Sequence, residues 1–218
     1  MARCRKNIPI RGIVYMHRIT DNRMGGTALR NFRMFHAICG PSAMQNAVIV
    51  LNMWEKSKQA VYEERERELR DTFFGDALKD GARMMRHDGS KASANEILKG
   101  IVGREPVDLA IQIEMGDRKL ALHATEAGLA LLGDLASRER KHIEELRQIR
   151  AELEEARLRR DTADEGDLKT AVRSLEAMRR RLSEEQTKVR SVAPRSGDNA
   201  SSQRTPEFFV YIKRLLLK

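Results

Sequence analysis

The apolar run Ala47-Val48-Ile49-Val50-Leu51 constrains the fold more than any other segment of this sequence. Five consecutive apolar residues, three of them β-branched, predict a strand that is buried on both faces. Such a strand needs helices on both sides of its sheet. Residues 12–16 form a second run of this kind, and residues 82–86 form a weaker third one. Because predicted helices separate the three runs, the sequence predicts a parallel α/β sheet.

The helices around these strands are predicted from their caps and their apolar spacing. Thr27 is the expected N-cap of a helix that ends at Gly40-Pro41, and a charged helix is expected over residues 57–73. A further helix begins at Ser90 or Ser93. The apolar face of that helix is expected to consist of Ala94, Ile97, Leu98, Ile101 and Val102.

The sequence changes character at about Pro106, where strand-like runs end and Ala, Glu, Arg and Leu dominate. Two apolar series then follow the spacing of a coiled-coil seam. They are Leu146, Ile149, Leu153 and Ala156, and then Leu168, Ala171, Leu175, Met178, Leu182 and Val189. Glu139 and His142 occupy core positions of the same pattern upstream, and residues 161–167 interrupt it. The pattern predicts an antiparallel helical hairpin or a dimerising coiled coil; a solvated helix pair without a specific partner fits it too.

The last part of the chain differs from the helical extension in composition. Residues 191–206 are rich in Ser, Gly, Asn and Pro, which predicts a disordered linker. Residues 207–218 form an apolar and basic tail that is too short to span a bilayer. This tail is expected either to lie on a membrane surface or to pack on the rest of the protein.

The net charge of +9 is concentrated near the N-terminus. Residues 1–34 hold eight Lys and Arg against one acidic residue, a net charge of +7. A short basic arm binds phosphates, but this one lacks the interleaved aromatic residues that stack on bases, so nucleic acid is not the expected partner. Two cysteines are too few for a disulfide framework, and no signal peptide is recognisable. A cytoplasmic location is therefore expected.

Common catalytic motifs are absent from the sequence. None of the five histidines pairs with another at metal-ligand spacing beside a carboxylate, and no G-x-S-x-G elbow occurs. Gly25-Gly26 is not followed by the Lys of a phosphate-binding loop. Cys39 lies at the end of an amphipathic helix, so it is expected to be a small buried hydrophobe rather than a nucleophile.

Several strings in the first hundred residues agree in order and spacing with a known family. They are His17-Arg18-Ile19-Thr20-Asp21-Asn22-Arg23-Met24-Gly25-Gly26, Asn31-Phe32-Arg33-Met34-Phe35, Val48-Ile49-Val50-Leu51-Asn52-Met53-Trp54 and Met85-Arg86-His87-Asp88. Together they resemble part of a P-loop GTPase, most closely the septin and immunity-associated (GIMAP-like) G-domain proteins of fungal type. The resemblance covers about residues 10–103. It implies that residues 1–104 are the C-terminal part of a G (GTP-binding) domain and that residues 105–190 are a coiled-coil extension.

The resemblance also implies where a guanine nucleotide would bind. The loop after the second strand corresponds to the base-recognition motif, whose four positions are Leu51, Asn52, Met53 and Trp54. Asn52 would present a donor and an acceptor to the base, and Trp54 would stack on it. His87, on the next loop, would lie beside the base. The same positions also fit a strand-end Asn that caps a turn and an exposed loop histidine without a partner.

The family's phosphate loop, with its Lys and its magnesium ligand, precedes the strand that begins here near residue 10. The resemblance therefore implies a truncated form that binds GTP or GDP weakly or not at all. By family the chain would be a GTPase, but it is expected to be inactive, with Mg²⁺ bound only if a P-loop is supplied from elsewhere. The first strand is expected to keep an unpaired apolar edge. The alternative function is a non-enzymatic interaction protein that associates with itself or another protein through a coiled coil over residues 132–190.

Overall fold

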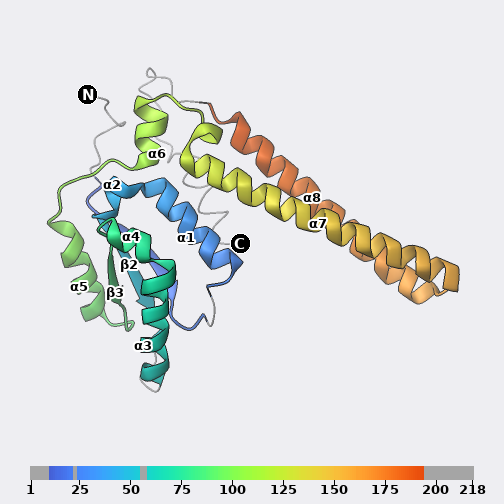
Figure 1. Cartoon of the computed structure of the whole chain (residues 1–218), viewed down its shortest axis with the longest axis horizontal. Helices are drawn as coiled ribbons and strands as arrows, with labels where there is room; N and C mark the ends of the chain where they lie inside the picture. The colour runs from blue at the N-terminus through green and yellow to red at the C-terminus, as the bar shows by residue number, and fades with distance from the viewer. Residues whose placement is uncertain (1–9, 22–23, 55–57, 194–218) are drawn as a thin grey trace. The chain divides into compact units, whose positions relative to one another are not determined.

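The computed structural model describes residues 10–21, 24–54 and 58–193 (Figure 1). The chain divides into two compact units, of which the first runs up to Lys119 and the second comprises Leu120–Ala193. The first unit holds a small parallel sheet with helices, and the second is a long helical hairpin. The predicted α/β class is thus confirmed, and so is the helical hairpin that follows it in the sequence.

Three strands form the sheet of the first unit: β1 (Ile13–Arg18), β2 (Ala47–Asn52) and β3 (Arg83–Arg86). Their order is β1-β2-β3, and both pairs are parallel. All three predicted strands are present, with ends shifted by one or two residues. The central strand β2 is buried along its whole apolar run because helices cover both faces of the sheet.

The helices and helical turns of the first unit lie between and after these strands. They are α1 (Gly26–Cys39), α2 (Pro41–Met44), α3 (Gln59–Glu68), the π-helical turn η2 (Leu69–Phe73), α4 (Gly75–Lys79), α5 (Lys91–Val102), α6 (Ala110–Gln112) and the π-helical turn η3 (Ile113–Asp117).

An aromatic cluster fills one face of the sheet. The ring of Tyr15 on β1 contacts Phe32 and Phe35 of α1, with centroid distances of 5.3 and 5.1 Å. Phe74, which follows η2, contacts Phe32 at 4.6 Å and the ring of His17 at 5.7 Å. Phe74 is completely buried, so it is the centre of this part of the core.

Helix α5 covers the opposite face, where Ile97 packs against Val48 and Val50 of β2. The N-cap of α5 is Ser90, whose hydroxyl accepts a hydrogen bond from the amide of Ser93 at 3.1 Å. Of the two predicted starts of this helix, Ser90 and Ser93, the first is therefore correct. The predicted apolar face is only partly correct: Leu98 and Val102 are exposed, since the three-stranded sheet is too narrow to cover them. The predicted Thr27 cap of α1 is wrong, because that helix begins two residues earlier, with Gly25 as its N-cap.

Residues 105–119 belong to the first unit, although their composition is closer to that of the helical extension than to that of the strands. The amide of the buried Asn46, just before β2, donates to the carbonyl of Glu105 at 2.7 Å. The amide of Val107 donates to the carbonyl of Ile10. These bonds hold the segment against the edge of the sheet where β2 begins.

The second unit consists of the short turn η4 (Leu122–Ala124) and two long helices, α7 (Glu126–Arg159) and α8 (Thr162–Ser191). The turn between the helices is shorter than predicted. Arg160 alone adopts a left-handed conformation, and Asp161 caps α8 by accepting a hydrogen bond from the amide of Asp164 at 3.2 Å. The expected break over residues 161–167 is therefore wrong, because its acidic residues favour the first turn of a helix.

The seam between α7 and α8 uses most of the predicted apolar positions. Five seam residues are buried, namely Leu146, Leu153, Ala156, Leu182 and Val189, whereas Met178 is exposed. Polar pairs also cross the seam: Gln186 donates to Glu139 at 2.9 Å, and Arg150 pairs with Glu176 at 2.7 Å. Glu139, which fitted the apolar pattern poorly, is thus accommodated by an amide partner.

Several expectations fall on residues that the structure does not describe. The linker over residues 191–206, apart from its first three residues, and the tail over residues 207–218 lie outside the described residues. So does the start of the basic arm, residues 1–9. In the described ranges, neither long helix carries the apolar stretch that crossing a bilayer requires.

Candidate functional site

The candidate site lies at the carboxyl edge of the sheet, where the loops after the parallel strands begin. Ligands of open parallel sheets bind in this position, outside the carboxyl ends of the strands. The loops after β2 and β3 are tied together at the carbonyl of Leu51. That oxygen accepts a hydrogen bond from the backbone amide of His87 at 2.7 Å and another from the indole N–H of Trp54 at 2.9 Å.

The backbone at this edge is held in a left-handed conformation at Met53, whose φ is +65°. A non-glycine residue in this region costs about 1–2 kcal/mol relative to ordinary backbone. Met53 is also exposed, so packing of its own side chain does not offset that cost. The conformation is instead fixed by its neighbours, the hydrogen-bonded Trp54 and the strand-end residue Asn52, on either side.

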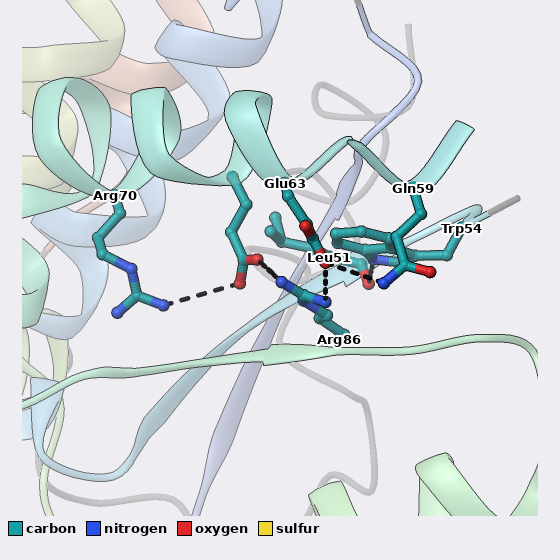
Figure 2. Close-up of polar contacts among 7 residues, drawn as sticks. Leu51, Trp54, Gln59, Glu63, Arg70 and Arg86 are labelled. Atoms are coloured by element: carbon teal, nitrogen blue, oxygen red, sulfur yellow. Dashed lines mark hydrogen bonds and ion pairs between the residues drawn. The ribbon is translucent and has the colours of Figure 1, made fainter. Parts of the chain in front are cut away.

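Trp54 is half-buried and lies beside Arg86 (Figure 2). The guanidinium of Arg86 lies over its ring, 4.5 Å from the centroid, and the ring of Tyr62 meets it edge-on at 5.7 Å. Because Arg86 occupies one face of the indole, a nucleotide base would stack only on the opposite face.

Arg86 also organises a group of charges around Trp54 (Figure 2). Its Nε donates to the carboxylate of Glu66 at 2.9 Å, and its Nη1 contacts Glu63 at 3.5 Å. Glu66 is buried and pairs with Arg70 as well, at 3.7 Å. The hydrogen bonds to Glu66 raise the pKa of Arg86. This charge group joins α3 to β3 beside the loop that follows β2.

Replacing Arg86 by Met removes the hydrogen bonds that its Nε and Nη2 donate to Glu66, so that the buried carboxylate keeps its pair with Arg70. We expect the unfolding free energy to fall by about 1–2 kcal/mol, a value reduced for the partial exposure of Arg86. Urea unfolding followed by Trp54 fluorescence measures it. Lys99→Met, which removes an exposed pair with Glu96, is the matched control and should change the unfolding free energy by less than about 0.5 kcal/mol. Equal effects of the two substitutions would contradict a structural role for Arg86.

Asn52 ends β2 and is the best-placed of the sequence-predicted site residues. Its backbone carbonyl accepts from the amide of Ile19 at 3.0 Å. Its side-chain Oδ1 is buried and has no hydrogen-bond partner among the residues that the structure describes. Buried acceptors are normally satisfied, so an unpartnered one at a strand end needs an explanation.

His87 does not match the description of an exposed histidine without a partner. Its ring is half-buried, and Nδ1 lies 2.8 Å from the hydroxyl of Ser93. Ser93 in turn donates to Asp88 at 2.6 Å, and hydrogen bonds from Ser90 and Ser93 hold the pKa of Asp88 well below its usual range. The loop after β3 is therefore a fixed structure that presents His87 next to the N-terminus of α5.

The buried polar residues of the first unit include His17 on β1 and Arg65 on α3, which the sequence did not mark as site candidates. Arg65 belongs to the stretch of alternating Glu and Arg in the charged helix that the sequence predicts over residues 57–73. The signal that would have found it is the spacing of Tyr62, Arg65 and Leu69, which places the arginine on the apolar face of its helix.

The described ranges contain no group of three or more His, Cys, Asp and Glu side chains arranged to hold a metal ion. Cys39 is buried, as expected, and burial raises the pKa of its thiol to about 12. A thiol with this pKa is unreactive at neutral pH.

Comparisons of the chain with protein-family models, with curated proteins and with solved structures give no significant match.

Proposed function

We propose that the first unit binds a guanine nucleotide at the carboxyl edge of its sheet and does not hydrolyse it. The observation that carries this proposal is the buried, unpartnered Oδ1 of Asn52 at the end of β2. The resemblance to G domains assigns the same residue to base recognition. Two independent observations, the sequence pattern and the unsatisfied acceptor, thus favour the same side chain as the base-binding group.

The chemistry of Asn52 suits a guanine base. An amide side chain offers an acceptor to the N–H groups of guanine and a donor to its ring acceptors. An unsatisfied buried acceptor costs about 1–3 kcal/mol, which a donor from the base would recover. The fold holds His87 near Asn52, since the backbone amide of His87 is bonded to the carbonyl of Leu51, the residue that precedes Asn52.

The absence of hydrolysis follows from the groups that phosphoryl transfer needs. A Gly-rich phosphate loop with Lys and Ser or Thr cradles the phosphates and the magnesium ion in P-loop NTPases. The 218 residues contain no such motif. Binding is therefore proposed to depend mainly on the base, with weak affinity and little discrimination between GTP and GDP.

Titration of the full chain with a fluorescent GDP analogue, followed by anisotropy, tests this proposal. We expect saturable binding that unlabelled GDP competes for, and a loss of about 10-fold to 100-fold in affinity for Asn52→Ala. Asn95→Ala, which removes an exposed Asn on α5, is the matched control and should bind like the wild type. Equal affinities of the two variants, or no binding by folded wild-type protein, would overturn the proposal.

The alternative function, association through the hairpin, draws less support from the structure. The seam residues that suggested association, such as Leu146 and Leu182, are buried within one chain between α7 and α8. A seam that is closed in this way offers no apolar stripe to a second chain.

A further inference from the structure

Two buried basic side chains near the carboxyl end of β1 have nitrogen atoms without a hydrogen-bond partner among the residues that the structure describes. Arg65 is 8% exposed and His17 is 4% exposed. Charged and polar groups are almost never buried to this extent unless they are hydrogen-bonded. The function proposed above does not use either residue.

The unpartnered atoms of Arg65 are Nε and Nη2, whereas its Nη1 pairs with Glu68 at the surface. Nε and Nη2 carry their hydrogens along the same edge of the guanidinium plane. This edge forms parallel hydrogen bonds to the two oxygens of a carboxylate or phosphate. The part of Arg65 that is left unsatisfied is therefore the part that recognises an oxyanion.

His17 supplies the second unpartnered atom, Nε2. Its ring packs edge-on against the buried Phe74. Burial lowers the pKa of His17, the charge of Asp21 raises it, and the charges of Arg65 and Arg18 lower it. Contacts of the sheet place the two side chains in the same region. His17 is paired with Leu51, and Trp54, which is bonded to Leu51, contacts Tyr62, one turn before Arg65 on α3.

We propose that Arg65 and His17 form a buried binding site for an oxyanion, a phosphate or a carboxylate group of a ligand. The Nε and Nη2 edge of Arg65 holds two oxygens of the anion, and Nε2–H of His17 donates to the same group. The anion adds a counter-charge to that of Glu68 beside a buried guanidinium, and it satisfies three buried polar atoms at once. The site lies at the sheet edge where parallel α/β folds bind ligands.

Calorimetric titration of the full chain with inorganic phosphate tests the site. We expect saturable binding that falls about tenfold or more for Arg65→Lys, which keeps the charge but loses the bidentate edge. Arg67→Lys changes an exposed arginine two residues away and should leave phosphate binding unchanged. Equal losses in the two variants would mean that phosphate binds through surface charge, and absence of saturable binding by the wild type would also overturn the proposal.

A second readout separates a binding defect from a folding defect. In NMR titrations, the pKa of His17 is expected to rise when phosphate is present, because a bound anion favours the imidazolium. An unchanged pKa at saturating phosphate would contradict the site even if Arg65→Lys proved unstable. Phosphate binding should survive in Asn52→Ala, so this inference and the proposed nucleotide function can fail separately.

Acetate and GDP identify the source of the anion. Acetate that competes with phosphate indicates that either oxyanion fills the site. GDP binding that falls in Arg65→Lys as well as in Asn52→Ala indicates that the nucleotide's own phosphate is the occupant. GDP binding that is unaffected in Arg65→Lys indicates a separate anionic ligand.

Discussion

Replacing Phe74 by Ala is expected to lower the unfolding free energy of the first unit by about 3–5 kcal/mol, the usual cost of removing a buried aromatic ring. Phe74 is completely buried and contacts Phe32, Tyr15 and His17, which belong to two different elements. Its aromatic neighbours Phe32, Tyr15 and His17 are held on α1 and β1, so we expect them to fill the space left by the ring only in part.

Urea unfolding followed by Trp54 fluorescence measures the effect of Phe74→Ala. Trp54 is the single tryptophan of the chain and belongs to the first unit, so its signal reports on that unit. Val61→Ala on the exposed side of α3 serves as the control, with an expected change of less than about 0.5 kcal/mol. Similar midpoints for the two variants would show that the aromatic cluster does not stabilise this face of the sheet.

The second large effect is expected at Gly128, in the first turn of α7. A Cβ atom at this position would overlap with the backbone carbonyl oxygen of Leu122, which belongs to η4. The turn cannot easily move, because the hydroxyl of Thr125 donates to the carbonyl of Leu122 at 2.7 Å and accepts from the amide of Gly128 at 3.0 Å. Gly128→Ala should therefore destabilise the hairpin by about 1–3 kcal/mol, despite the higher helix propensity of Ala.

Gly133→Ala provides a control of opposite sign in the same helix. A Cβ at Gly133 meets no atom within 4 Å, so only helix propensity changes. We expect this substitution to stabilise the hairpin by about 0.5–1 kcal/mol. Thermal unfolding followed by far-UV circular dichroism compares the two. Stabilisation by both substitutions would show that Gly128 is not in close contact with η4.

The strands and the hairpin could be predicted because their signals are local. The run Ala47–Leu51 is apolar at every position, and the seam residues from Leu146 onward keep a regular spacing. The position of residues 105–119 could not be predicted in this way. It depends on the side chain of Asn46 reaching the carbonyl of Glu105, a contact between residues far apart in the sequence.

The candidate site was predictable only in part, for a similar reason. Asn52 ends β2 and His87 follows β3, so their place at the carboxyl edge follows from the parallel topology. The burial of Arg65 depends on how α3 turns toward the sheet, and its neighbours in sequence are charged. The contact of the Arg86 guanidinium with the Trp54 ring likewise joins the ends of β3 and β2, which no local sequence pattern connects.

The most direct test of the central claim is the response of the NMR signals of the full chain to GDP. Since Trp54 is the only tryptophan, its indole N–H gives a single side-chain signal from the loop after β2. Binding at the carboxyl edge predicts saturable shifts of this signal and of the amides of Asn52 and His87, and the Asn52→Ala variant should weaken them. Unchanged signals of these residues at saturating GDP, or shifts confined to α7 and α8, would contradict the assignment of the nucleotide site.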